Sequence, residues 1–195
     1  MTAPTPPAAA ILLAGGRASR MDGIDKPLVE VGGRSLLQRA VDAVRDCSPV
    51  VAVGPASPVV GVAPVWVRED PPFGGPAAAI VTGLEQIGGA EWTFVLACDL
   101  PFAEDAVARL AEAIGILPAD VDGVCLADAG SRPQWLTGVY RTRALRDAAS
   151  AVPDRGRNAP VRALLDDLAI AVVTDPGAAR DIDTWDDLRR IEEER

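Results

Sequence analysis

Short apolar runs alternate with stretches of helical periodicity along almost the whole chain, and this alternation constrains the fold more than any other feature. The runs predict strands at residues 8–13, 50–53, 64–67, 92–98, 121–127, 134–140 and 169–173. The spacing of apolar residues between them predicts helices at residues 77–86, 104–114, 141–149 and 158–167, a helix from Ser35 to about residue 45, and a terminal helix capped by Thr184. Alternating strands and helices are typical of βαβ units, whose strands form a mostly parallel sheet.

The strands predicted at residues 121–127 and 134–140 differ from the others, because only the polar turn at residues 128–133 separates them. So short a connection favours a hairpin, which puts an antiparallel strand into the sheet. The 195 residues contain no internal repeat and no long linker, which fits one domain. We therefore expect a flexible N-terminal tail at residues 1–7 and a single α/β domain at residues 8–195, with a three-layer α/β/α, Rossmann-like fold.

The composition excludes several kinds of chemistry. Histidine is absent, which excludes Ser-His-Asp and Cys-His hydrolysis and the common histidine-ligated zinc sites. Cys47, Cys98 and Cys125 have no CxxC spacing, which argues against a disulfide framework and fits a reducing cytoplasm. The net charge of −9 disfavours nucleic acid and anionic membranes as partners, and no apolar run approaches the roughly 18 residues of a membrane span. Catalysis is left to carboxylates, Lys and Arg, backbone amides or a bound metal.

A glycine-rich segment follows the first predicted strand and carries three cations. Gly15 and Gly16 let the backbone bring N–H groups close to a ligand, with no Cβ in the way. Arg17 and Arg20 can donate paired hydrogen bonds to separate phosphates, and Lys26 follows as a point charge. The spacing is neither the GxGxxG of dinucleotide-binding folds nor the GK[ST] of a P-loop. The segment predicts a triphosphate site, the alternative being a tight turn with two surface arginines.

Asp99 directly follows the strand predicted at residues 92–98, the most convincing central strand of the chain. In open α/β sheets ligands bind beyond the carboxyl ends of the strands, so a carboxylate at this position faces the site. Such oxygen ligands suit Mg²⁺, which bridges phosphate oxygens. The alternative is that Asp99 caps the helix predicted at residues 104–114.

Several segments resemble one family, in the family's order and across nearly the whole chain. The stretch LAGGRASRMDGIDKPL at residues 13–28 is similar to the signature of the molybdenum cofactor guanylyltransferase (MobA-type) family of the nucleotidyltransferase superfamily. The resemblance continues at Asp70 with its GGP loop, at CDLP (residues 98–101) and at DIDT (residues 181–184). The chain departs from the pattern at Asp22, where glycine is usual, and at Gly54, where asparagine is frequent.

The resemblance implies roles for individual residues. It assigns nucleotide binding to Leu13, Ala14, Gly15, Gly16, Arg17, Lys26, Asp70, Gly75, Pro76 and Asp99. It makes Arg20, Lys26 and Asp99 the catalytic residues: Arg20, Lys26 and the Mg²⁺ held by Asp99 would neutralise charge on the triphosphate and the leaving group. Asp99 and Asp183 would hold Mg²⁺ as the cofactor. Asp181 is the alternative second ligand, because alternate residues at the end of a strand point to opposite faces.

The same resemblance implies the reaction. GMP would pass from GTP to the phosphate of molybdopterin with release of pyrophosphate, in molybdenum cofactor maturation, and proteins that deliver or accept the cofactor would be transient partners. The Gly15-Gly16 pair favours the guanylyl branch. The alternatives are cytidylyl transfer to molybdopterin, nucleotidyl transfer to another phosphorylated small molecule, and a non-catalytic nucleotide-binding regulator.

Other conspicuous residues are expected to be structural. Cys98 is expected to be a small, buried apolar residue. The loop at residues 156–158 stays open as a candidate contact for the acceptor. The tryptophans are expected in the core or between helices rather than as stacking surfaces: Trp66, Trp92, Trp135 and Trp185.

Overall fold

The computed structural model describes residues 7–15, 25–182 and 184–194 of the chain. The strands are β1 (Ala8–Leu13), β2 (Glu30–Val31), β3 (Arg34–Ser35), β4 (Val50–Val53), β5 (Val65–Val67), β6 (Trp92–Ala97), β7 (Gly123–Ala127), β8 (Pro133–Arg141) and β9 (Ile170–Thr174). The helices are α1 (Leu36–Ala43), α2 (Pro76–Leu84), α3 (Ala103–Ile114), α4 (Thr142–Ala151), α5 (Arg162–Leu165) and α6 (Trp185–Glu193), with 3₁₀ turns η1 (Lys26–Leu28) and η2 (Pro153–Gly156). Each of the seven strands and six helices whose ranges were predicted has a counterpart, although some bounds differ.

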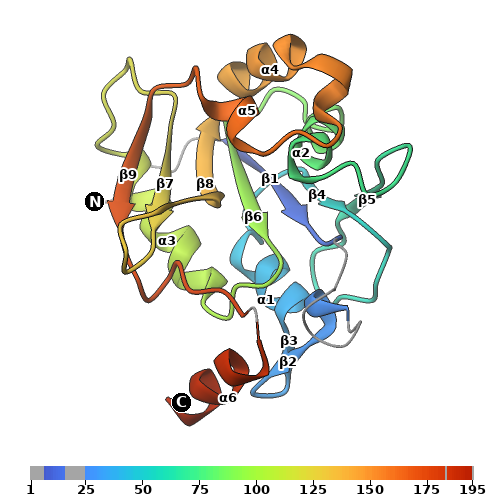
Figure 1. The fold of residues 1–195 in the computed structure, drawn as a ribbon, viewed down its shortest axis with the longest axis vertical. Helices are drawn as coiled ribbons and strands as arrows, with labels where there is room; N and C mark the ends of the chain where they lie inside the picture. The colour runs from blue at the N-terminus through green and yellow to red at the C-terminus, as the bar shows by residue number, and fades with distance from the viewer. Residues whose placement is uncertain (1–6, 16–24, 183, 195) are drawn as a thin grey trace.

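The strands form a seven-stranded sheet in the order β5-β4-β1-β6-β8-β7-β9 (Figure 1). β5, β4, β1 and β6 pair in parallel, whereas β8 runs antiparallel to both of its neighbours. β9 pairs in parallel with β7. The expectation of a mostly parallel sheet with an antiparallel strand is confirmed, and that strand belongs to the predicted hairpin.

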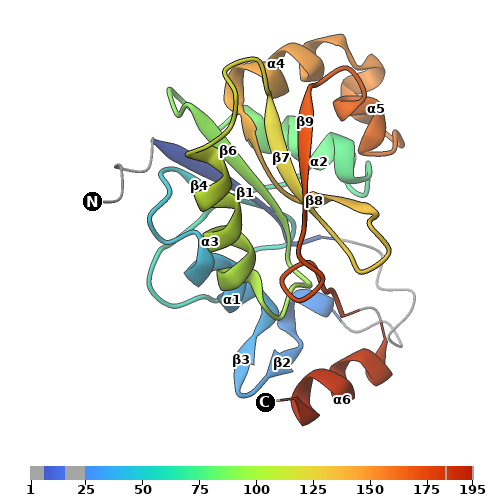
Figure 2. The ribbon, with the colours of Figure 1, turned by 90° about the vertical axis from the view of Figure 1, so that its left-hand side faces the viewer.

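Helices cover both faces of the sheet, which gives the expected three layers (Figure 2). One apolar cluster joins α1 and α3 to inward residues of the sheet such as Leu12 and Phe94. The other joins α2, α4 and α5 to the residues of the opposite face, including Ile11 and Val95. Neighbouring residues of β1 and β6 thus point to opposite layers, as the pleat of a strand requires. Both faces of these central strands are buried, which explains their continuous apolar sequence.

The helix ends follow local sequence signals. The hydroxyl of Ser35 accepts from the backbone N–H of Gln38 at 3.1 Å, which caps α1 as predicted. Thr184 and Asp187 form a capping box at the start of α6. Pro76 is the first residue of α2, a position where its missing N–H costs nothing. Within the described part of the chain, no helix is both long enough and apolar enough to cross a bilayer.

Some local expectations were wrong or incomplete. The helix expected over residues 158–167 is confined to Arg162–Leu165, because Asn158 has a φ of +55° and its N–H donates to the carbonyl of Gly74 at 2.6 Å. Asp181 and Ile182 do not belong to a strand, although a strand end was expected there. The short β2–β3 hairpin was not predicted. Its turn is formed by Gly32 and Gly33, both with positive φ, which is a recognisable two-residue turn signal.

Candidate active site

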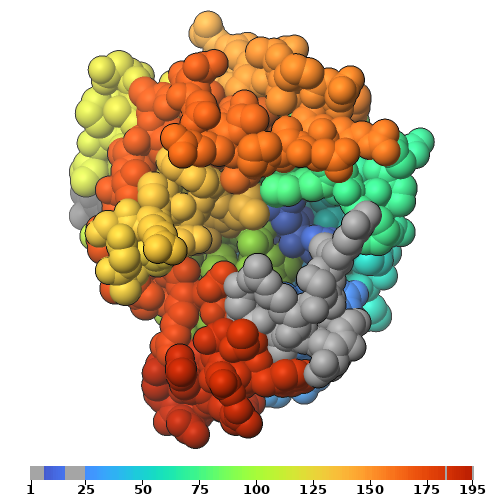
Figure 3. Space-filling model, viewed as in Figure 1, coloured from blue at the N-terminus to red at the C-terminus, as the bar shows by residue number. Residues whose placement is uncertain are grey.

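The carboxyl ends of β1, β4 and β6 bring the first group of predicted residues together. Ala14 donates its N–H to the carbonyl of Val53 at 2.9 Å, and Cys98 donates to the carbonyl of Leu13 at 3.2 Å. The pairing therefore continues past the ends of the strands and fixes the chain at Gly15 and Asp99. In the space-filling view this side of the molecule is hollowed, with green residues of β6 visible between the yellow hairpin and the orange residues above (Figure 3).

Gly54 and Gly15 form the tightest part of this edge. A Cβ on Gly54 would lie 2.7 Å from the carbonyl carbon of Ala14 and 2.9 Å from the amide nitrogen of Gly15. Gly54 also has a φ of +151°. Any side chain at position 54 would therefore require the backbone to move. Between Gly54 and the Ala14–Gly15 segment, the contact is consequently backbone against backbone.

Lys26 and Asp99 are the predicted catalytic residues that the structure places as neighbours. Lys26 begins η1, and its Nζ lies 3.8 Å from Oδ2 of Asp99. The side chain of Lys26 is 20% exposed and that of Asp99 is 24% exposed, so both charged groups are accessible to a ligand from solvent. The N-cap of α3 is Phe102, so the alternative role of Asp99 as a helix cap is wrong.

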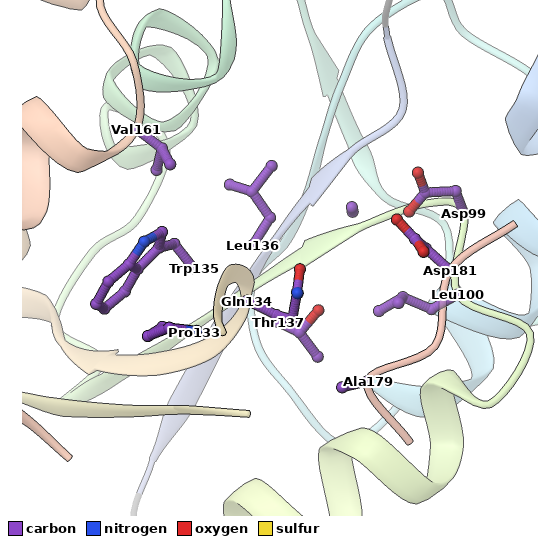
Figure 4. A pocket seen from close by; sticks show the side chains of 11 residues that line it. Asp99, Leu100, Pro133, Gln134, Trp135, Leu136, Thr137, Val161, Ala179 and Asp181 are labelled. Carbon is purple, nitrogen blue, oxygen red and sulfur yellow. The ribbon is translucent and has the colours of Figure 1, made fainter. Parts of the chain in front are cut away.

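Asp99 lies at one end of a cavity of about 250 Å³. Asp181 also lines this cavity, and Figure 4 shows both carboxylates at the same end. The two segments are joined by a hydrogen bond of 3.1 Å from the N–H of Ile182 to the carbonyl of Asp99. Ile182 is fully buried while Asp181 is exposed, which turns the Asp181 side chain outwards toward the site.

This carboxylate pair bears on the predicted metal. Among the described residues, no group of three or more Asp, Glu, His or Cys side chains is arranged to hold an ion. Mg²⁺ does not need such a group, because it commonly binds through one or two carboxylates and takes its other ligands from water and substrate phosphates. The hard oxygen donors of Asp99 and Asp181 fit this mode of binding.

The other end of the cavity is formed by the beginning of β8. Trp135 and Val161 stand on the side away from Asp99 (Figure 4). Gln134 and Thr137 supply polar groups between the two ends. Sequence reasoning did not assign these residues to the site. It expected Trp135 to pack against the core or between helices, and Trp135 does pack against the apolar cluster of α2, α4 and α5 while it lines the cavity.

Comparison with known proteins agrees with this geometry. The sequence model of the family described as the MobA-like NTP transferase domain matches residues 10–173. A molybdenum cofactor guanylyltransferase from Methylibium petroleiphilum is 33% identical over 200 residues, which cover 95% of each chain. The chain belongs to the MobA-like NTP transferase family.

Solved structures share this fold. Molybdopterin-guanine dinucleotide biosynthesis protein A from Archaeoglobus fulgidus superposes with a TM-score of 0.69 at 21% identity, covering 95% of this chain and 97% of its own. The 2-C-methyl-D-erythritol 4-phosphate cytidylyltransferase from Thermus thermophilus superposes with 0.68 at 22% identity, covering 96% and 98%.

In this MobA-like chain, Asp70 lies apart from Asp99. It lines a second cavity of about 240 Å³ together with Gly74 and Arg157. Gly75 and Pro76 begin α2 and line neither of the two cavities. The loop at residues 156–158 packs against the Asp70–Pro76 loop, because the N–H of Asn158 donates to the carbonyl of Gly74 at 2.6 Å. Its role as a contact for the acceptor stays a prediction.

Several expectations fall on residues that the structure does not describe. Gly16, Arg17 and Arg20 of the glycine-rich segment and the metal ligand Asp183 lie outside the described residues. Their roles stay predictions. Lys26, Asp99 and Asp181 are the charged residues of the predicted set whose placement at the Asp99 edge can be described.

The remaining structural expectations are largely confirmed. Cys98 is 2% exposed, and burial raises the pKa of its thiol well above the ordinary range. Trp92 is buried in the core beneath the guanidinium of Arg141. Trp185 differs, since 40% of it is exposed at the start of α6.

Proposed function

We propose that this protein transfers GMP from GTP to the phosphate of molybdopterin, with Mg²⁺ bound, and releases pyrophosphate. The observation that carries the proposal is the Lys26–Asp99 pair, 3.8 Å apart at the carboxyl edge of the sheet. It lies beside the backbone site of Ala14 and Gly15 in a chain of the MobA-like family. The relative from Methylibium petroleiphilum, similar over nearly its entire length, is named for this guanylyl transfer.

The reaction needs no nucleophile from the protein. An oxygen of the acceptor's phosphate attacks the α-phosphorus of GTP and forms a new P–O bond. The bond from that phosphorus to the oxygen bridging to the β-phosphate breaks, and pyrophosphate leaves with the electron pair. This agrees with a chain that has no histidine, because an acceptor phosphate is already deprotonated at neutral pH and requires no general base.

The protein's contribution is to position the reactants and neutralise their charge. The backbone at Ala14 and Gly15 holds the nucleoside side of GTP above β1. Lys26 stabilises the negative charge that accumulates on the leaving pyrophosphate, and the same role is proposed for Arg20. Asp99, together with Asp181 or Asp183, would hold Mg²⁺, which when bound withdraws charge from the phosphate oxygens. Preorganised charges of this kind supply most of the acceleration in phosphoryl and nucleotidyl transfer.

The choice of guanine as the base of the nucleotide depends on contacts near Gly54. Because Gly54 leaves no room for a side chain, the frequent asparagine contact has no counterpart at this position. Backbone groups of the β1 and β4 edge, and Asp70 beyond β5, are the proposed replacements. Cytidylyl transfer to molybdopterin is the second candidate, since a smaller base would need fewer contacts at the Gly54 edge.

The test is turnover of purified protein with molybdopterin, Mg²⁺ and either GTP or CTP, followed as pyrophosphate release. We expect release with GTP and little with CTP. Release from CTP alone would replace the guanylyl assignment by the cytidylyl one. No release from either nucleotide would contradict the enzyme function itself, whereas binding of GTP without turnover would indicate a regulator.

The proposed setting is the cytoplasm, where molybdopterin is passed between proteins. Cys47, Cys98 and Cys125 are all free thiols, which agrees with a reducing compartment. Proteins that deliver molybdopterin or accept the finished cofactor are the proposed transient partners.

A further inference from the structure

We propose that the cavity between Asp99 and β8 receives the ring system of the acceptor, and that Trp135 is the surface on which this ring stacks. The inference rests on the proposed function and deepens it, because it names the residue that selects the acceptor. The acceptor chemistry that fits is a flat, uncharged heterocycle joined through a short linker to a phosphate.

The order of strands separates the two substrates. β5, β4 and β1 lie on one side of β6, and β8 lies on the other. The predicted nucleotide residues Ala14, Gly15 and Asp70 follow β1 and β5, while Asp99 follows β6. The bond between the substrates must form where their phosphates meet, which is at Asp99 and Lys26. The acceptor then extends away from the nucleotide, into the cavity toward β8.

The lining of the cavity is charged at one end and apolar at the other, which matches an acceptor with a phosphate at one end and a ring at the other. Asp99 and Asp181 stand at one end, where phosphates and their cation meet (Figure 4). Trp135 and Val161 stand at the other, with Gln134 and Thr137 able to hydrogen-bond the edge of a heterocycle. The lining residues include no Lys or Arg in the described part of the chain, so the far end does not favour a second anionic group.

A β-bulge gives Trp135 its position. β7 pairs Cys125 with Gly138 but the adjacent Leu126 with Gln134, so residues 135–137 of β8 have no partner on β7. Bulges of this kind redirect side chains and occur next to active sites. The interruption lies where β8 passes the cavity, and Trp135 and Thr137 both line it.

The bulge is held from within the core. Tyr140 is fully buried, and its hydroxyl donates to the carbonyl of Trp135 at 2.7 Å. A Cβ on Gly138 would lie 2.5 Å from that hydroxyl oxygen, so glycine is required for Tyr140 to reach across. A buried side chain thus fixes the backbone of Trp135, which packs against the apolar cluster of α2, α4 and α5 and also lines the cavity. Tyr140 is accordingly a positioning residue for Trp135.

The size of the cavity limits what it can hold. Its volume of about 250 Å³ is below the roughly 300–1,000 Å³ of pockets that enclose drug-sized ligands. It can take one fused ring system and not a whole nucleotide. A flat ring gains the most from such a space when it lies against an aromatic face, which is the contact that Trp135 offers.

The experiment separates ring binding from turnover by using pterin alone as the probe. Titration of the full-length protein with pterin is followed by quenching of the pterin's own fluorescence. The variants are Trp135→Ala and Trp135→Phe, and the control is Trp66→Phe on β5, at the other side of the sheet. We expect Trp135→Ala to weaken pterin binding roughly 5- to 100-fold, the range for loss of one aromatic stacking contact. Trp135→Phe should fall in between, and Trp66→Phe should bind like the unaltered protein.

Steady-state kinetics give the second measurement. We expect Trp135→Ala to raise the KM for molybdopterin by a similar factor while the KM for GTP stays within about twofold. Equal pterin affinity in the unaltered protein and Trp135→Ala would overturn the inference, as would no detectable pterin binding to the unaltered protein. A rise in the KM for GTP alone would assign the cavity to the nucleotide. If pterin binds through Trp135 but neither GTP nor CTP yields pyrophosphate, the proposed function fails while the ring site stands.

Discussion

The two sides of Asp99 are built in different ways. On the side of β1 and β4, backbone meets backbone so closely that Gly54 has no space for a Cβ. On the side of β8, a bulge opens the sheet and side chains such as Trp135 and Thr137 form the wall. Among the described residues, the β1 and β4 side thus depends on close backbone packing, whereas the β8 side depends on the identity of its side chains.

Asp99 stands between the two sides, and its replacement should have the largest effect. Asp99→Asn keeps the shape of the side chain but removes the charge, so we expect pyrophosphate release to fall by about 10²–10³-fold. The thermal unfolding temperature should change little, because Asp99 is partly exposed and caps no helix. Asp167→Asn, on an exposed segment, is the matched control. Full activity in Asp99→Asn would refute the proposed metal site.

Gly54→Ala tests whether the nucleotide side depends on its backbone packing. The added Cβ would meet Ala14 at 2.7 Å, and overpacking of this kind costs about 1–3 kcal/mol. We expect a lower midpoint of urea denaturation and a higher KM for GTP, with the KM for molybdopterin less affected. Gly89→Ala is the control, since a Cβ there has no atom within 4 Å. An unchanged KM for GTP would show that the close approach serves stability alone.

Tyr140→Phe tests the acceptor side without touching the cavity. Loss of the hydroxyl removes the hydrogen bond to Trp135, which contributes about 0.5–1.5 kcal/mol to stability. We expect a several-fold rise in the KM for molybdopterin, with the KM for GTP unchanged. Thr93→Val is the control, because it removes a buried hydroxyl pair with Thr142 at the opposite end of β6. An equal rise in both KM values, or the same rise in Thr93→Val, would reduce Tyr140 to a purely structural residue.

The smallest effect is expected from thiol reagents, although Cys98 lies next to Asp99. Burial raises the pKa of Cys47 and of Cys125 from 9.0 to about 12, and raises that of Cys98 further. The thiols are therefore protonated and unreactive at pH 8, and their contribution to stability is lost only as the pH rises from about 9 towards 12. We expect little labelling of native protein and unchanged pyrophosphate release, but labelling of all three cysteines after denaturation in urea. Rapid inactivation at pH 8 would show that the edge around Asp99 opens readily.

Sequence reasoning succeeded where a signal lies within a few neighbouring residues. The cap at Ser35, the proline that begins α2 and the apolar run of β6 were all predicted, because each depends on local backbone chemistry or on burial of both strand faces. It failed where distant segments compete for the same backbone groups. Asn158 donates its N–H to the carbonyl of Gly74 and has a φ of +55°, which an α-helical residue does not adopt, so the helix expected there begins later.

By itself, the sequence determined the three-layer fold, the glycine-rich segment after β1 and the position of Asp99 at the end of β6. Each of these depends on a local feature of the sequence: the periodicity of apolar residues, the spacing of glycines or the end of an apolar run. Only the tertiary structure decided that Lys26 and Asp99 are neighbours, that Asp181 faces the same cavity as Asp99, and that Trp135 lines that cavity. The last of these depends on a register change opposite Cys125 and on a hydroxyl reaching over Gly138. No local pattern encodes such a register change, since it results from two strands with different partners being fitted into one sheet.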